Sequence, residues 1–310
     1  MAINLWYVIV LFAPGGVVRF NRVVLLLILA LCVSTFPAVG EELSNLLPSL
    51  VGRVPLRKTP PAMSGSEFAL RISGVDGPAR ERMIEEQLLA GNVPDFLKEL
   101  KPVRLKGKSE GGEQAVATIF VTPDYLAVGS NEDFLLTPMN LMTALRVAAS
   151  YGFVLPTKKI VDAIFAQSDV HLMPEPMTAG PEMRSTRYYV THDRKIKEQR
   201  RSLGATLTSL VSGDKKDVVL SNRLLRNPGK IAIYGWHRPS GSPIQPLSTV
   251  HGERYADYSH GIRLVSDVVL IDDKPASIYK VLEDPGLAAL LSDEGAIRGI
   301  RQLLPNLDAR

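Results

Sequence analysis

Segments with helix-type and strand-type periodicity do not alternate regularly along this chain, and their order constrains its fold more than any other feature. Apolar residues recur at helical spacing in five early segments, 78–90, 93–100, 138–151, 156–167 and 192–204. Strands are predicted where β-branched and aromatic residues gather, at 114–122, 125–128, 230–236, 244–247, 255–265 and 268–271. Two more helices are predicted at 278–291 and 293–304. Grouped helices and strands favour an α+β fold with an antiparallel-rich sheet and flanking helices, and argue against a doubly wound fold.

Composition divides the chain into three predicted parts. Residues 1–40 form a signal peptide or N-terminal anchor, 41–65 an extended tether, and 66–310 a single α+β domain. The tether is predicted because 41–63 contains four prolines and no aromatic residue. Within the domain, 170–183 is expected to be an irregular loop, because it holds three prolines and a glycine. Loops of this kind often act as lids or binding loops.

The N-terminal part carries a short apolar run, Val23–Val33, with arginines before it and the small-x-small triplet Ala38–Gly40 after it. A membrane-spanning helix needs about 20 apolar residues, whereas the core of a secretory signal needs about 7–15. We therefore expect export with cleavage near Gly40. A second apolar run at 5–13 leaves an uncleaved membrane anchor open, unless translation begins near Val17.

The only cysteine, Cys32, lies inside the apolar run. Cleavage near Gly40 would remove it, so the mature protein would have no disulfide, no thiolate nucleophile and no cysteine metal ligand. A lipoprotein anchor at Cys32 is an alternative, but Leu31 stands where that motif needs a small residue. An exported domain without disulfides depends on its hydrophobic core, and a chain of this length is long enough to build one.

The charge balance is close to neutral and predicts no nucleic-acid partner. The chain has 36 basic and 32 acidic residues, a formal charge of +4, whereas nucleic-acid binding calls for a strongly basic face. One basic cluster occurs in 194–201, and interruptions such as Glu198 favour a solvated helix face. Neither a dinucleotide motif nor a phosphate loop is present, so no nucleotide cofactor is indicated, and Ser212–Asp217 is predicted to be a turn.

Histidines concentrate in one stretch of the C-terminal half. Three of the five, His237, His251 and His260, lie within 24 residues of one another, and Asp257 and Ser259 lie among them. Imidazole is the side chain whose unperturbed pKa is closest to neutrality, so a carboxylate and a hydroxyl beside it give a candidate reactive site. These five residues are our predicted catalytic or ligand-binding residues.

Aromatic residues accompany the histidines. We expect them to bind substrate, because aromatic faces stack on sugar rings and line peptide clefts, although core packing would account for them equally well. The four residues are Tyr234, Trp236, Tyr255 and Tyr258.

Strand geometry limits how these groups can meet. In a strand over 255–260, side chains alternate, so Asp257 and Ser259 share one face and His260 lies on the other. A dyad between Asp257 and His260 would need a bulge or a strand end near Ser259, which Gly261 would tolerate.

Two mechanisms fit these residue types. In the first, Ser259 is the nucleophile, a histidine is the general base and Asp257 orients that base, although no G-x-S-x-G elbow surrounds any serine. In the second, the histidines hold a divalent metal that activates water, with or without Asp257. No H-E-x-x-H occurs, and His251 and Asp257 are six apart where wall metallopeptidases use seven. A purely structural polar network remains a third interpretation.

Three segments, 123–139, 155–164 and 234–265, resemble a group of exported bacterial proteins. The resemblance implies that these segments belong to one domain, and it assigns no catalytic residue.

Together these observations predict an exported hydrolase, periplasmic or extracellular, that acts on a glycan, peptide or ester of the cell envelope or on a small-molecule substrate. A divalent metal is the one cofactor that the second mechanism would use. The N-terminal segment would provide any membrane anchoring. The alternative function is a non-catalytic envelope-binding module whose histidine cluster is structural.

Overall fold

A computed structural model describes residues 62–108 and 112–303. The predictions for 1–40, and for all but the last residues of 41–65, therefore lie outside the described residues. All described residues belong to one compact unit, 46–310. No helix in the described part of the chain is long and apolar enough to cross a membrane.

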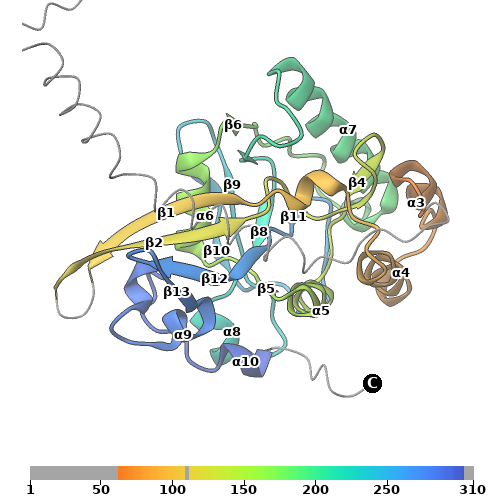
Figure 1. Cartoon of the computed structure of the whole chain (residues 1–310). Helices are drawn as coiled ribbons and strands as arrows, with labels where there is room; N and C mark the ends of the chain where they lie inside the picture. Colours follow the sequence, from red (N-terminus) through yellow and green to blue (C-terminus); the bar gives the residue numbers. More distant parts are fainter. Residues whose placement is uncertain (1–61, 109–111, 304–310) are drawn as a thin grey trace, which may run out of the picture. The chain divides into compact units, whose positions relative to one another are not determined.

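The first sheet has five strands and is wholly antiparallel (Figure 1). Its strands are β1 (Lys101–Lys108), β2 (Gln114–Val121), β12 (Val265–Ile271), β13 (Lys274–Ser277) and β5 (Phe153–Val154). Strand β1 was not expected from the sequence, because its exposed positions are mainly lysine and arginine. Its buried positions include Val103 and Leu105, two residues apart, as the period of a half-buried strand requires. The predicted turn after 268–271 is confirmed, and Asp272 and Asp273 adopt positive φ there.

The second sheet carries most of the histidine stretch. In spatial order its strands are β10 (Pro243–Ser248), β9 (Ile233–His237), β8 (Lys216–Val218) and β11 (His260–Gly261). Only β8 and β11 run parallel. The hairpin predicted from 230–236 and 244–247 is confirmed as β9 and β10.

Two further strand pairs are small. The antiparallel pair is β3 (Ala127–Gly129) with β4 (Phe134–Leu136), and the parallel pair is β6 (Val170–His171) with β7 (Val211–Ser212). Antiparallel pairing dominates, so the predicted α+β class is confirmed.

Helices surround these sheets. The α-helices are α3 (Gly65–Arg71), α4 (Gly77–Leu89), α5 (Leu141–Tyr151), α6 (Lys158–Gln167), α7 (Thr186–Ser202), α8 (Asn222–Arg226), α9 (Ile278–Glu283) and α10 (Ile300–Leu303). Single 3-10 turns are η1 (Asp95–Lys98), η2 (Pro181–Arg184) and η3 (Ala288–Leu290). The helices predicted at 78–90, 138–151, 156–167 and 192–204 are confirmed as α4 to α7. Asn140 and Thr157 cap α5 and α6 through their side-chain oxygens.

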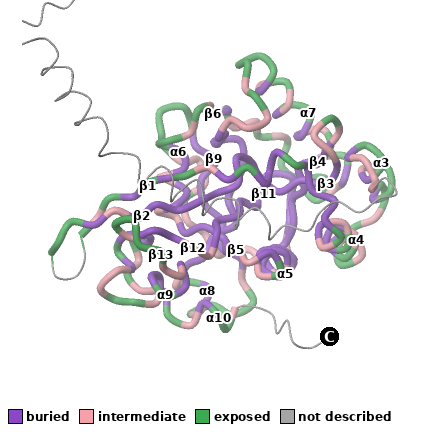
Figure 2. Tube along the Cα trace, viewed as in Figure 1, coloured by how far each residue is buried: buried purple, intermediate pink, exposed green. Residues whose placement is uncertain are grey.

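Helix α6 joins the two sheets, because it contacts β1 of the first and β9 of the second. Helix α9 packs on β12 and β13, and α4 packs on α5 (Figure 1). The central strands of the two sheets, β2, β12, β8 and β9, are largely buried, whereas the edge strands β10 and β13 have no buried position (Figure 2).

Three expectations for secondary structure were wrong. The predicted strand 255–265 is a turn that enters the sheet only at His260, because the Asp257 carboxylate accepts the Ser259 N–H at 2.8 Å and competes with strand pairing. The helix predicted at 93–100 is the single turn η1, which follows Pro94. The two C-terminal helices are cut short, and Gly295 and Gly299 adopt positive φ between them.

Candidate functional site

The structure divides the predicted histidines between two places. His237 ends β9 and its Nε2 lies 3.1 Å from Oδ1 of Asp162 on α6. The same carboxylate accepts hydrogen bonds from the Tyr234 hydroxyl and from Lys158. Burial opposes ionisation of Asp162, but these three hydrogen bonds outweigh it and lower its pKa.

A cavity of about 450 Å³ lies beside this group, lined in part by Phe165, Tyr234 and His237. Phe165 stacks on His237 with ring centres 4.6 Å apart, and also on His171. His237 and Tyr234 therefore belong to the α6 side of β9, away from the other predicted residues.

The other predicted residues gather around the turn that precedes β11. Asp257 is buried and accepts hydrogen bonds from the Tyr255 hydroxyl and from both the N–H and the hydroxyl of Ser259. Burial raises the pKa of Asp257, but the nearby His260 and Lys216 and the Ser259 hydrogen bonds together lower it below its usual value. Asp257 is thus an ionised carboxylate with its oxygens bound to Ser259 and Tyr255, and it forms no hydrogen bond with a histidine.

His260 is the most unusual of these groups. Its side chain is 1% exposed, and among the described residues neither ring nitrogen makes a well-formed hydrogen bond. Burial lowers the pKa of His260 to about 4, although Asp257 opposes the shift. The Met139 backbone also raises this pKa, so one main-chain polar group acts on the ring. His260 is therefore a neutral, buried imidazole whose nitrogens are less well satisfied than those of an ordinary core histidine.

Aromatic rings connect His260 to His251. The Tyr255 ring stacks on His251 with centres 4.0 Å apart and an interplanar angle of 10°. Its edge meets the His260 ring at 5.7 Å. Tyr255 thus contacts both histidine rings and connects His251 to the site.

Lys216 and Trp236 complete the group. Lys216 pairs with His260 across β8 and β11, and its Nζ lies 4.9 Å from the centre of a Trp236 ring. Burial lowers the pKa of Lys216, while Asp257 opposes that shift. Trp236 has φ of 56°, and its buried indole N–H meets no acceptor among the residues that the structure describes. Positive φ is strained for a bulky residue, and such strain concentrates at functional sites.

We call Lys216, Trp236, Asp257, Ser259 and His260 the His260 cluster. A loop covers its aromatic side: the Met177 N–H donates to the Tyr258 hydroxyl at 2.7 Å, and the Tyr258 N–H donates to the Met183 carbonyl at 3.0 Å. Met177 and Met183 also pack on Trp236 and Tyr258. The predicted loop 170–183 is irregular over most of its length, and it lies against the site.

Sequence reasoning missed the buried charges next to this cluster. Lys215 is 1% exposed and donates to the Tyr258 carbonyl and to Nδ1 of His192. Burial lowers the pKa of Lys215 to about 8 and raises that of Asp214 to about 7. Within the described part of the chain, neither carboxylate oxygen of Asp214, both of them buried, forms a hydrogen bond with another residue. The turn predicted over Ser212–Asp217 is confined to a bend at 213–215, because Ser212 belongs to β7 and Lys216 and Asp217 belong to β8. Apolar residues flank this bend on both sides, and that pattern signals burial of the charges between them.

The basic face expected on α7 is only partly solvated. Arg200 is buried and forms an ion pair with Asp124, which is also buried. The other members of the cluster are exposed or half-buried, as expected.

The metal mechanism finds little support in the geometry. Within 62–108 and 112–303, no group of three or more histidine, cysteine, aspartate or glutamate side chains is placed to hold a metal ion.

Comparisons with protein-family models, with curated proteins and with solved structures find no match to this chain. The site must therefore be interpreted from its own geometry.

Proposed function

We propose that the protein is an exported hydrolase that cleaves an ester or peptide bond of an extracellular or cell-envelope substrate, with His260 as its general base. The observation that carries the proposal is a neutral, buried imidazole, without a well-formed hydrogen bond among the described residues, beside the Asp257 carboxylate and the Lys216 ammonium. Perturbed titratable groups of opposite charge around one imidazole are typical of acid–base sites.

In the proposed reaction His260 takes a proton from a water molecule as the water oxygen attacks the substrate carbonyl carbon. Negative charge forms on the carbonyl oxygen, and the Lys216 ammonium stabilises it. The tetrahedral intermediate then breaks its bond to the leaving group, and the imidazolium of His260 returns the proton to that group. One proton is taken from water and one is delivered, so His260 ends the cycle neutral.

The hydrogen bonds of Asp257 favour water over Ser259 as the nucleophile. The Ser259 hydroxyl donates to Asp257 and, among the described residues, makes no hydrogen bond with an imidazole, so the histidine base of the serine mechanism is not in place. Asp257 acts by holding Ser259 and Tyr255 in place and by its charge close to His260. The arrangement thus differs from the serine-nucleophile mechanism, one of the two that the residue types allow.

Among the predicted substrate classes, the cluster supports peptides and esters over glycans. Glycoside hydrolysis usually needs two carboxyl groups on opposite sides of the scissile bond. The His260 cluster contains one carboxylate, Asp257, and both of its oxygens are already bound to neighbouring groups. A base with a nearby ammonium suits attack on a carbonyl instead.

Substrate reaches His260 only if the cover moves. The two hydrogen bonds between Tyr258 and the 177–183 segment, together with two methionines, close the aromatic side of the cluster. We propose that this segment acts as a lid, as such loops do in many enzymes. Opening it would expose Trp236 and release the packing that holds it in its strained conformation.

The proposal that the protein is exported depends only on the sequence of the predicted signal peptide, residues 1–40. N-terminal sequencing of the mature protein tests it, and a new terminus near Gly40 would support cleavage. A terminus that retains residues of the 5–13 run would show that the leader stays attached.

The catalytic proposal is tested with His260→Gln and Lys216→Met, assayed on a panel of chromogenic esters, short peptides and cell-wall polymer. The matched control is His171→Gln, since His171 is an exposed histidine on β6. We expect His260→Gln to lower kcat/KM about 100-fold or more, the usual contribution of a general base. Circular dichroism and Tm confirm that each variant is folded. Full activity in a folded His260→Gln protein would rule out His260 as the base.

A non-catalytic envelope-binding module is the second candidate. The 450 Å³ cavity beside α6 favours it, because Phe165 and Tyr234 line that cavity and Asp162 and His237 provide polar groups. Such a lining suits a sugar or peptide ligand. Binding of wall polymer that is lost in Tyr234→Ala, with no turnover by any variant, would support the module over the enzyme.

A further inference from the structure

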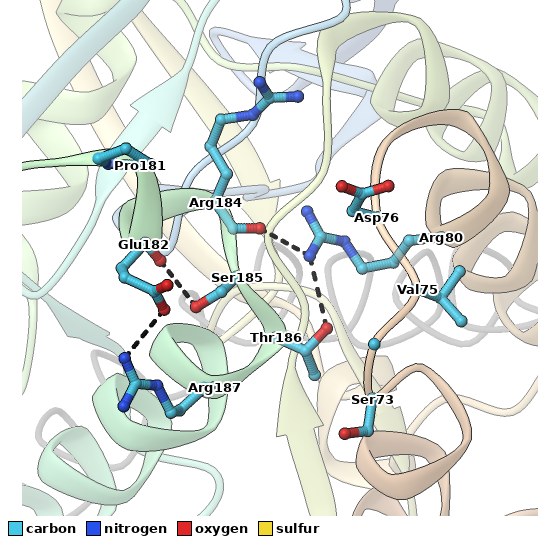
Figure 3. A pocket seen from close by; sticks show the side chains of 11 residues that line it. Ser73, Val75, Asp76, Arg80, Pro181, Glu182, Arg184, Ser185, Thr186 and Arg187 are labelled. Atoms are coloured by element: carbon cyan, nitrogen blue, oxygen red, sulfur yellow. Dashed lines mark hydrogen bonds and ion pairs between the residues drawn. The ribbon is translucent and has the colours of Figure 1, made fainter.

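A cavity of about 510 Å³ lies outside the His260 cluster, where the start of α4 faces the start of α7. Figure 3 shows the side chains that line it. From the α4 side come residues 73–76 and Arg80, and from the η2 and α7 side come residues 181, 182 and 184–187.

Two helix N-termini open onto this cavity. Helix α4 begins after Asp76, whose side chain makes no capping hydrogen bond. Helix α7 has 17 residues and begins after Ser185, which accepts the Tyr188 N–H through its side chain. The backbone N–H groups of Thr186 and Arg187, at the first two positions of α7, have no acceptor among the described residues. Open N–H groups and the helix dipole make such an end attractive to anions.

A buried cation provides an independent indication. Arg80 is 2% exposed and reaches across to the start of α7, where it donates to the Arg184 carbonyl and to Thr186 (Figure 3). It also donates to the Tyr189 hydroxyl. In the described part of the chain no carboxylate forms an ion pair with Arg80, although the charge of the buried Glu81 next to it interacts with it, and the Arg80 Nε has no partner there. A buried guanidinium normally has an anionic partner, because desolvating an unpaired charge is costly.

Exposed charged side chains around the cavity leave an excess of positive charge there. Arg184 and Arg187 lie on its rim, and Arg187 pairs with Glu182 at 3.0 Å. Asp76 is the second carboxylate of the lining. Three guanidinium groups thus face two carboxylates, and the helix ends add further positive potential.

We propose that this cavity binds the phosphate or carboxylate group of a small organic ligand. The ligand's oxyanion would accept hydrogen bonds from the open N–H groups of α7 and from the exposed guanidinium groups of Arg184 and Arg187. Its negative charge would balance the positive charge of Arg80. Small-molecule sites usually measure about 300–1,000 Å³, so the cavity can hold more than a bare ion. This inference does not depend on the hydrolase proposal.

The test is isothermal titration calorimetry of the full-length protein with inorganic phosphate and with acetate, at low ionic strength, against sodium chloride as the blank. We expect saturable binding of at least one of the two, and the stronger one identifies the group. Arg184→Gln combined with Arg187→Gln should weaken binding about tenfold or more, through the loss of charge-assisted hydrogen bonds. The matched control is Arg201→Gln, because Arg201 forms a similar exposed ion pair with Glu198 at the opposite end of α7.

Two more variants address the interior of the site. Arg80→Met should abolish binding, and Asp76→Asn should strengthen it because a competing anion is removed. If Arg80→Met does not fold, the Arg184 and Arg187 double variant decides. No saturable binding by either anion would overturn the proposal. So would an equal loss in Arg201→Gln and in the double variant, since that outcome marks non-specific charge attraction.

Discussion

The Nζ of Lys215 donates a hydrogen bond of 2.6 Å to the backbone carbonyl of Tyr258. This bond ties the start of β8 to the turn that holds Asp257 and Ser259, although the two segments are 43 residues apart. The same ammonium lies 3.0 Å from His192 on α7. One buried lysine therefore holds together the three elements that surround the His260 cluster.

Lys215→Ala should destabilise the protein by about 3 kcal/mol, because it leaves the Tyr258 carbonyl unsatisfied and the buried Asp214 carboxylate without its nearest cation. Urea unfolding at pH 7 measures the free energy of unfolding. Lys274→Ala, in the exposed turn that begins β13, is the control and should change stability by less than about 0.5 kcal/mol. Equal stability of the two variants would show that Lys215 does not anchor the turn.

Asp214→Asn should change how stability depends on pH. Burial raises the pKa of Asp214 in the folded state to about 7 from 3.8, so the folded protein binds its proton more tightly than the unfolded chain does. The stability this provides is complete below about pH 4 and is lost as pH rises through 7. Asp214→Asn should therefore gain stability relative to wild type over this range, by at most about 4 kcal/mol. Unfolding free energies measured from pH 4 to 8 test the sign, and parallel curves for the two proteins would contradict it.

Gly261→Ala should be strongly destabilising. A Cβ at this position would lie 2.6 Å from two carbon atoms of the Tyr125 ring and 2.7 Å from the Cβ of Lys215. Overpacking of this kind costs about 1–3 kcal/mol. Gly252→Ala is the matched control, because its Cβ would meet only the Gly229 carbonyl oxygen, at 3.7 Å. A fall in Tm confined to Gly261→Ala is the expected result, and similar Tm values for the two variants would contradict the close approach.

Tyr258→Phe should loosen the proposed lid. The substitution removes the hydroxyl that accepts the Met177 N–H and keeps the ring that packs on Trp236. Limited proteolysis should cut within residues 172–185 several times faster than in wild type, since local opening exposes that backbone. Tyr279→Phe, on α9, is the control. Unchanged cleavage in Tyr258→Phe would mean that Tyr258 does not hold the segment closed.

The fold class and several individual elements follow from local patterns in the sequence. Helices α5 and α6 have an apolar stripe, a capping side chain and a clear start, and all three are visible in the residues themselves. The hairpin of β9 and β10 is signalled by its turn residues. Strand β1 was missed because its charged outer face hides the alternation of Val103 and Leu105.

The site was predicted only in part. Five of the predicted residues do come together: Asp257, Ser259, His260, Tyr255 and His251. They lie on a turn and not on the strand predicted at 255–265, because the Asp257 side chain accepts a hydrogen bond from the Ser259 N–H. His237 was expected beside them, and α6 provides a different partner, Asp162. Which strand faces which helix depends on long-range packing, and no local pattern in the histidine stretch records it.

The pH dependence of kcat/KM, measured on the best ester or peptide substrate, tests the role of His260 most directly. Because burial lowers the pKa of His260 to about 4, a base that must be neutral stays active down to that pH. We predict a plateau through the neutral range, an acid limb centred near pH 4, and loss of the reaction in His260→Gln. An acid limb near 6.5, the ordinary pKa of histidine, or an unchanged profile in His260→Gln would contradict the proposed mechanism.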